Sequence, residues 1–216
     1  MTVRWVTFDC YGTLIDWEGG VADALLPLLA AGIDRDALAR RYIEIEAEVE
    51  AGDYVKYRDV LDRAGRRLLA EHGVDAASPL PASLPSWRPF PEVPAALLAL
   101  RQRGRRIAIL SNVDREGIAA SIERIGVPPD LVVTAEDCGS YKPAPGHWLR
   151  FQRESGASAG ETVHVGASQY HDIRPATGLG YRTVFIDRHG EPLESEPARV
   201  IADLARLPDI VDELAG

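Results

Sequence analysis

The chain has 216 residues, 46% of them apolar, and a formal net charge of −9. This length and composition suffice for a full core, either as one domain or as a core with an inserted module. The acidic balance argues against nucleic acid as a partner, because a polyanion needs a basic face. With two cysteines, no basic-then-apolar leader and no apolar run near the roughly 20 residues that span a bilayer, we expect a reduced, cytoplasmic protein that enters no membrane.

The first predicted strand covers residues 3–8 and ends at Asp9, just before a turn that contains Gly12. The strand fixes the position of the carboxylate, and the turn leaves backbone N–H groups free to face an anionic substrate. Asp9 is therefore our candidate nucleophile.

A helical block follows between about residues 20 and 70. Apolar side chains recur there at spacings of four, three and four, which places them on one helix face: Leu38, Tyr42, Ile45 and Val49. Asp34 is the expected N-cap and Gly52 the expected stop of this helix. The acidic stretch 44–50 predicts its solvent-exposed face. The proline-rich segment 78–94 predicts a linker back to the core, without a regular element of its own.

Strands and helices then alternate. The predicted strands are 105–110, 131–134, 162–165 and 182–186, and the predicted helices are 94–103, 115–125, 145–154 and 173–179. Short apolar strands separated by helices predict a parallel sheet covered on both faces. We therefore expect an α/β fold with a Rossmann-like core (residues 1–16 and 88–216) and a helical insert (residues 17–87) after the first strand.

Ligands bind at the carboxyl ends of the strands in such sheets. Ser111 and Asn112 end the second strand, Lys142 follows the third, and Asp172 lies in the turn after the fourth. Each alone is compatible with an ordinary turn or cap. Together with Asp9 they predict one polar crevice.

These motifs, Asp-Cys-Tyr-Gly-Thr-Leu, Leu-Ser-Asn, Tyr-Lys-Pro and an acid-bearing turn, resemble those of the haloacid dehalogenase (HAD) superfamily. The resemblance implies a Rossmann-like core, a helical cap after the first strand and a covalent aspartyl intermediate. Tyr11, two residues after the nucleophile, resembles the 2-haloacid dehalogenase branch. Some members of the family are dimers, so a homodimer is a further expectation.

Tyr11 stands where phosphatases of this family carry an acid that protonates the leaving alkoxide. A tyrosine, with an ordinary pKa of about 10, donates a proton poorly. A halide leaves unprotonated and needs no such acid. Ala167 likewise stands where phosphatases commonly place an acid that helps to hold Mg²⁺. Both residues favour carbon–halogen displacement without a cofactor.

The resemblance implies that Asp9 attacks the halogen-bearing carbon of a small 2-haloacid and that water, assisted by Asp172, hydrolyses the ester to a 2-hydroxy acid. Lys142 would keep Asp9 ionised, while Thr13 and Ser111 would hold the carboxylates. The expected contacts with the small anionic substrate or its halide are Tyr11, Asn112, Arg41 (or Arg40), Trp148, Ser168, Gln169 and His171. Trp17 and Tyr57 are further pocket candidates, although aromatic residues in a helical insert are more often core.

Three other functions compete with this hypothesis. A Mg²⁺-dependent phosphatase would hold its metal through Asp9, the Tyr11 carbonyl and Asp172. A related hydrolase could cleave another carbon–heteroatom bond. A catalytically idle binding module is disfavoured, because an unused buried charge cluster is costly to maintain.

Overall fold

The computed structural model describes residues 2–190 and 192–216. Its strands are β1 (Trp5–Phe8), β2 (Arg106–Ser111), β3 (Leu131–Thr134), β4 (Thr162–Gly166), β5 (Arg182–Ile186) and β6 (Arg199–Ile201). The helices are α1 (Trp17–Leu25), α2 (Arg35–Glu50), α3 (Tyr57–Glu71), α4 (Leu80–Ser83), α5 (Val93–Gln102), α6 (Arg115–Ile125), α7 (Ala135–Cys138), α8 (Gly146–Ser155), α9 (Arg174–Gly178) and α10 (Leu207–Ala215). Short 3₁₀ turns cover Leu26–Leu28, Leu84–Ser86 and Ala159–Glu161, and a π-helical turn covers Gln169–Ile173.

The strands form one parallel sheet in the order β3-β2-β1-β4-β5-β6. Strand β1, which leads into Asp9, is therefore central, between β2 and β4, as a doubly wound sheet requires. The predicted α/β architecture with a parallel sheet is confirmed. The sequence pattern did not predict β6, α7 or α10, because these elements are short and lie at an edge or at the end of the chain.

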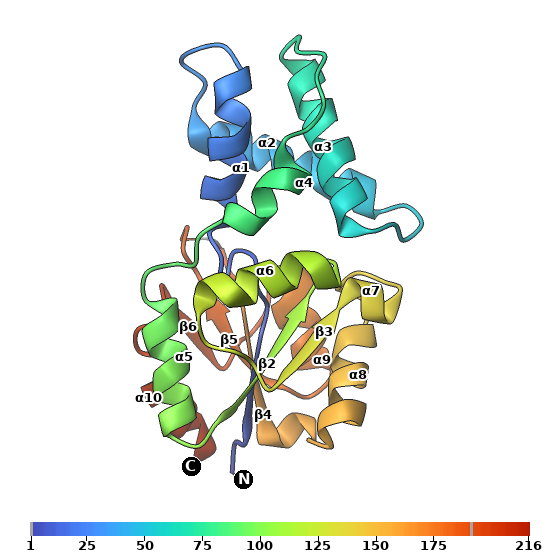
Figure 1. Ribbon diagram of the computed structural model, residues 1–216. Coiled ribbons are helices and arrows are strands. Elements are labelled where there is room, and N and C mark those ends of the chain that lie inside the picture. The colour runs from blue at the N-terminus through green and yellow to red at the C-terminus, as the bar shows by residue number, and fades with distance from the viewer. Residues whose placement is uncertain (1, 191) are drawn as a thin grey trace.

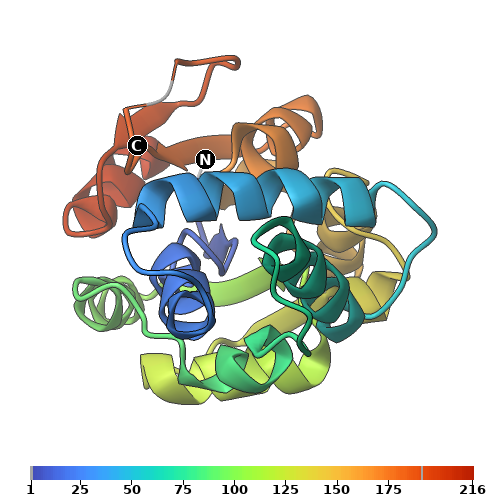
Figure 2. The ribbon, with the colours of Figure 1, turned by 90° about the horizontal axis from the view of Figure 1, so that it is seen from above.

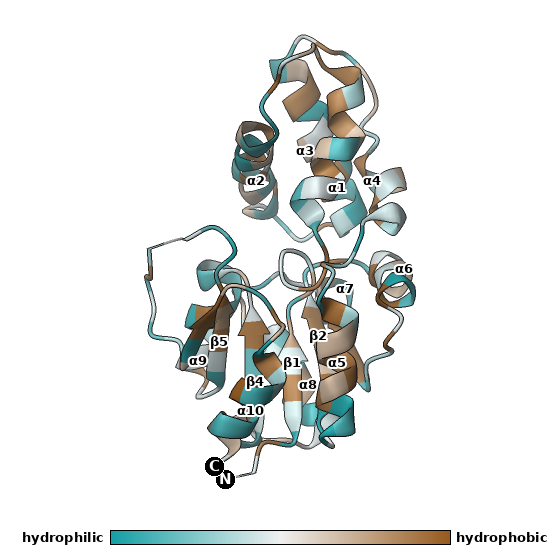
Figure 3. Cartoon of the chain, turned by 90° about the vertical axis from the view of Figure 1, so that its left-hand side faces the viewer, coloured by the Kyte–Doolittle hydropathy of each residue, from teal (hydrophilic) through white to brown (hydrophobic). Residues whose placement is uncertain are grey.

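Both faces of the sheet are buried, and alternate residues of each strand point to opposite faces. Val6 and Phe8 belong to one apolar cluster with α5 and α10, whereas Trp5 packs with Trp148 and Phe151 of α8 in a second cluster. The strands are accordingly largely brown between their covering helices (Figure 3). This two-sided packing holds the carboxyl ends of the strands in fixed positions.

Helices α1–α4 make up the helical insert and lie beyond the sheet edge at which β1 ends, opposite the two chain termini (Figure 1). The side chain of Asp34 accepts a hydrogen bond from the N–H of Ala37 and starts α2, as predicted. Figure 2 shows α2 crossing the upper side of the molecule, with α1 and α3 both on one side of it. The insert thus faces the edge of the sheet where ligands bind in α/β folds.

The proline-rich segment is not a bare linker. It contains α4 and a following 3₁₀ turn, with Pro81 and Pro85 in their first turns. Proline is tolerated there because the first N–H groups of a helix have no partner within the helix. In the described part of the chain, no helix is long and apolar enough to cross a membrane.

Candidate active site

Asp9 directly follows β1, and Lys142 lies in the segment after β3 and α7. The two side chains are in contact. Lys142 Nζ donates hydrogen bonds to Asp9 Oδ1 (2.8 Å), to Asp172 Oδ1 (2.6 Å) and to the carbonyl of Leu110 (2.9 Å). All three ammonium protons therefore have acceptors. The lysine is 2% exposed, so the two carboxylates compete for one buried positive charge.

The two carboxylates differ in their access to solvent. Asp172 is 1% exposed and Asp9 is 8% exposed, which leaves Asp9 as the one that a substrate can reach. Asp172 packs tightly against Gly166, where an added Cβ would lie 2.5 Å from the Cβ of Asp172. A glycine is therefore required at the end of β4 for the second acid to approach the lysine.

Thr13 links the loop that contains Asp9 to the turn after β4. Its hydroxyl donates to Asp9 Oδ2 (2.9 Å) and accepts from the N–H of Ala167 (2.9 Å). The intervening Gly12 has a φ of +92°, in the left-handed region that favours glycine. The local turn thus fixes the orientation of the Asp9 carboxylate.

The charges in this cluster are strongly coupled. Burial and the nearby Asp172 raise the pKa of Asp9, while Lys142 and Thr13 act against them. Burial also acts to raise the pKa of Asp172, but Lys142 and His164 hold that pKa below its usual value. Burial acts to lower the pKa of Lys142, and the two carboxylates outweigh it and raise that pKa. Asp172 and Lys142 therefore stay charged, and Asp9 is the carboxylate whose charge is least stabilised.

Tyr11 is turned toward the helices. Its hydroxyl shares a 2.7 Å hydrogen bond with the hydroxyl of Ser121 on α6, and its ring meets Trp87 edge to face. Burial, followed by the neighbouring Cys10, raises the pKa of Tyr11 well above its usual value. A hydroxyl with that pKa is a poor proton donor to a leaving group.

Comparisons with known proteins agree with this geometry. Residues 3–180 match the family model for haloacid dehalogenase-like hydrolases. The chain belongs to this family. It is 30% identical over 193 residues to haloacetate dehalogenase H-2 of Moraxella sp. (strain B), an alignment that covers 86% of each chain. It is 25% identical to the (S)-2-haloacid dehalogenase of Pseudomonas sp. (strain YL), over 99% of this chain and 97% of that one.

The fold of this hydrolase is shared with a solved relative. The L-2-haloacid dehalogenase from Xanthobacter autotrophicus superposes with a TM-score of 0.85 at 20% identity, covering 98% of this chain and 99% of that one. The predicted resemblance to the 2-haloacid dehalogenase branch is confirmed.

Several predicted residues hold the site of the hydrolase together without facing the crevice. Asn112 accepts from the N–H of Lys142 (2.7 Å) and donates to its carbonyl (3.3 Å), so it fastens the lysine backbone. Ser111 is fully buried, and its carbonyl lies 3.1 Å from His147 Nε2. The Asn112 amide therefore positions Lys142, and a contact between Asn112 and the substrate stays a prediction.

The turn after β4 also uses its predicted residues locally. The Ser168 hydroxyl accepts from the N–H of His171 (3.0 Å) and lies 3.1 Å from His171 Nδ1, which caps the turn. Gln169 donates to the carbonyl of Pro192 (2.7 Å) and accepts from the N–H of Glu194 (2.6 Å). The side chain of Gln169 thereby binds the loop after β5, and its expected role in substrate binding stays a prediction.

Trp148, a predicted substrate contact, lies in the core. It is fully buried in the apolar cluster with Trp5, Phe151 and Tyr181, below the sheet edge that carries Asp9. The inward face of α8 packs on the sheet, and the large ring of Trp148 fills the space between the helix and the strands. Its place in the fold is explained by packing.

Arg41, predicted to bind the halide or the substrate, is held in ion pairs. Its guanidinium binds Glu71 at 2.9 and 2.6 Å and Glu44 at 2.6 Å, between the outer sides of α2 and α3. Arg40 is exposed as well. The inner side of α2 is occupied instead by Tyr42, which is fully buried one position further along the helix.

This placement makes a prediction. Replacing Arg41 by alanine should leave kcat/KM for a haloacid within about twofold of the unchanged enzyme, because the side chain is paired at the surface. Steady-state halide release measures this. A loss of a hundredfold or more would place the guanidinium in the crevice during turnover.

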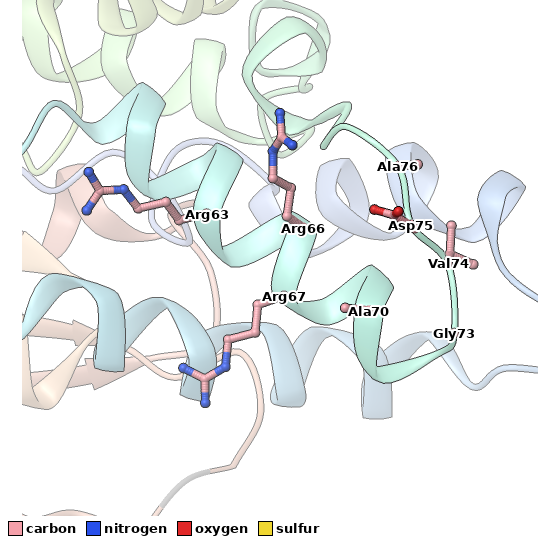
Figure 4. A pocket seen from close by; sticks show the side chains of 8 residues that line it. All are labelled: Arg63, Arg66, Arg67, Ala70, Gly73, Val74, Asp75 and Ala76. Atoms are coloured by element: carbon pink, nitrogen blue, oxygen red, sulfur yellow. The ribbon is translucent and has the colours of Figure 1, made fainter.

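A hollow of about 570 Å³ on the helical insert lies away from these reacting groups and is lined in part by Arg63, Arg66 and Arg67 of α3. Figure 4 shows the three arginine side chains pointing in different directions. Arg66 pairs with Asp62 and Arg67 with Glu48. The three cations do not converge on one point, and this hollow therefore lacks the geometry of an anion site.

Proposed function

We propose that this hydrolase removes halide from a small 2-haloacid through a covalent ester on Asp9. The observation that carries the proposal is the residue two positions after the nucleophile: Tyr11 has a raised pKa and a hydroxyl bound to Ser121. A reaction with a basic leaving group would lack its acid there, whereas halide leaves without a proton. The names of the two curated relatives support the same chemistry.

In the first step a carboxylate oxygen of Asp9 attacks the halogen-bearing carbon. A carbon–oxygen bond forms as the carbon–halogen bond breaks, and halide departs with the bonding electrons. Lys142 keeps Asp9 ionised despite its burial, and Thr13 orients its second oxygen. The product of this step is an ester between Asp9 and the substrate carbon.

In the second step water attacks the carboxyl carbon of Asp9. Asp172 stays ionised because its pKa is lowered, so it accepts a hydrogen bond from the attacking water. The resulting oxyanion lies beside Lys142, which stabilises it. The ester bond to Asp9 breaks, the alkoxide takes a proton from the water, and the freed Asp9 carboxyl ionises again.

Magnesium fits these residues poorly. Asp9 and Asp172 each accept a hydrogen bond from Lys142 Nζ through one oxygen. Ala167 has a methyl group at the position where a third carboxylate would complete the set of magnesium ligands. Magnesium favours near-octahedral oxygen ligands that include carboxylates. The steps above use only side chains of the chain itself. We further propose residues 17–87 as a cap over this site and residues 1–16 and 88–216 as the catalytic core.

The test is halide release from chloroacetate and (S)-2-chloropropionate, measured with and without EDTA. We expect release of one halide per turnover at a rate that the chelator leaves unchanged. Phosphate release from p-nitrophenyl phosphate that requires added Mg²⁺, without any halide release, would replace the proposal by the phosphatase alternative.

A further inference from the structure

The side of α2 that is buried at Tyr42 also carries two carboxyl groups, those of Glu46 and Glu50. Tyr42, Glu46 and Glu50 are spaced by four residues and share that side. Glu46 Oε1 accepts hydrogen bonds from the hydroxyl of Tyr42 (3.1 Å) and from that of Tyr57 (2.7 Å). Tyr57 in turn donates its backbone N–H to Asp114 of the core (3.0 Å). Glu46 is thus fixed where the helical insert meets the core.

Two other acids of the same helix are neutralised in a different way. Glu44 pairs with Arg41 and Glu48 pairs with Arg67, each at 2.6 Å, on the outer side. Within residues 2–190 and 192–216, no arginine or lysine forms an ion pair with Glu46 or Glu50. Lys142 is near enough to act on Glu50, but its three protons are already donated elsewhere.

These surroundings favour the neutral form of both acids. Burial raises the pKa of Glu46. Burial and then Glu46 raise the pKa of Glu50 to about 8, against the opposing effect of Lys142. Glu50 is also the last residue of α2, where the helix dipole disfavours a negative charge. A protonated carboxyl group donates a hydrogen bond, which an ionised one does not.

We propose that Glu46 and Glu50 determine the charge of substrate that the site accepts: as neutral acids they admit an anionic haloacid above Lys142, and the ionisation of Glu50 repels it. The inference rests on the proposed reaction, because it assigns the haloacid anion to this crevice. A substrate anion adds to two carboxylates that already share one ammonium group. A further negative charge beside them raises the cost of binding through like-charge repulsion.

Apart from Glu46 and Asp9, whose pKa values burial also raises, the titratable groups around Glu50 and Lys142 keep their charge between pH 7 and pH 9. Burial raises the pKa of the surrounding tyrosines and of Cys10, and the two carboxylates raise that of Lys142; these groups are Tyr42, Tyr54, Tyr57, Tyr141, Cys10 and Lys142. Asp172 lies beyond Lys142 and has a lowered pKa. A change in affinity centred near pH 8 is therefore assigned to Glu50 where Glu50→Gln removes it.

The experiment is the pH dependence of KM for (S)-2-chloropropionate. Between pH 7 and pH 9 KM should rise about tenfold in the unchanged enzyme, as expected when one group of pKa about 8 must be protonated for binding. Glu50→Gln should give a KM that varies less than about twofold over the same range. Glu48→Gln is the matched control, because Glu48 lies on the outer side of the same helix, and it should follow the unchanged enzyme. A flat profile in the unchanged enzyme, or a tenfold rise in Glu50→Gln, would overturn the inference.

A binding measurement separates this inference from the proposed reaction. Calorimetric titration with (S)-lactate, the product anion, requires no turnover. Its affinity should fall about tenfold from pH 7 to pH 9 in the unchanged enzyme and in Glu48→Gln, but not in Glu50→Gln. Lactate binding with this dependence but without halide release would refute the reaction and retain the selection by charge. Halide release together with a lactate affinity that is independent of pH would support the reaction and refute the selection by charge.

Discussion

Asp9→Asn is expected to abolish halide release, with kcat lowered by at least about 10⁴-fold. The amide has almost the shape of the carboxylate but lacks the nucleophilic charge. The fold should not suffer, because burial raises the pKa of Asp9 and its ionised form therefore costs stability at neutral pH. We expect the melting temperature of the variant to equal or exceed that of the unchanged enzyme, so the loss of turnover is separable from misfolding.

Asp16→Asn provides a matched control, because Asp16 lies seven residues further along and caps α1 through the N–H of Gly19. Asparagine caps helices as well as aspartate does, so this variant should keep its activity.

A single turnover in ¹⁸O-labelled water tests the ester on Asp9 in a second way. The label should enter Asp9, because water attacks its carboxyl carbon. Label found only in the hydroxy acid after one turnover would contradict the ester intermediate.

The polar cluster could be predicted from sequence because the topology of a parallel sheet fixes where its strands end. Asp9, Lys142 and Asp172 follow three separate strands, and the sheet brings all three carboxyl ends to one edge. Their mutual contacts follow from that geometry. The periodicity of residues 38–49 likewise predicted the buried face of α2 and its start at Asp34.

The side of α2 that faces the site could not be predicted, because the docking of the helical insert decides it. The acidic stretch was assigned to solvent as one block, yet Glu44 and Glu48 lie outside while Glu46 and Glu50 lie inside. The signal that could have separated them is the spacing of four residues from the buried Tyr42. Arg41 comes one position before Tyr42, about 100° away around the helix axis, and it therefore lies toward the outer side.

The local hydrogen bonds of the turn after β4 could not be predicted for a related reason. The sequence places Ser168 and Gln169 at a strand end, but it does not show which backbone groups nearby need partners. The structure supplies those partners: the N–H of His171 for Ser168, and the loop around Pro192 for Gln169. Such local hydrogen bonds satisfy polar groups that would otherwise be buried without a partner.

Lys142→Met should both stop catalysis and destabilise the fold. Methionine keeps an unbranched apolar stem, but Asp9 and Asp172 then lose their shared ammonium group. Removing one partner of a buried ion pair costs about 3–5 kcal/mol, because the remaining charge is left uncompensated. We expect a loss of that size in the free energy of unfolding at pH 8, measured by urea denaturation, together with loss of halide release.

The chain offers a direct control, because Lys56 and Lys142 are its two lysines. Lys56 pairs with Glu136 at the surface, and its side chain is 55% exposed, so Lys56→Met should lose at most about 1 kcal/mol. Equal losses in the two variants would contradict the account of Lys142 as the shared counter-charge.

The pH dependence of the stability of Lys142→Met also tests whether Lys142 is the shared counter-charge of Asp9 and Asp172. In the unchanged enzyme the pKa of Lys142 is raised, so its stabilising effect is fully present below the pKa of an unfolded lysine, and hence at both pH 5 and pH 8. In the variant the folded-state pKa values of Asp9 and Asp172 rise above those of the unfolded chain. Its deficit should therefore be smaller at pH 5 than at pH 8, as protons replace the missing ammonium. Adding Asp9→Asn should recover part of the loss at pH 8, because one of the two uncompensated charges is then gone; a double variant that is less stable than Lys142→Met would show that the carboxylates do not repel each other.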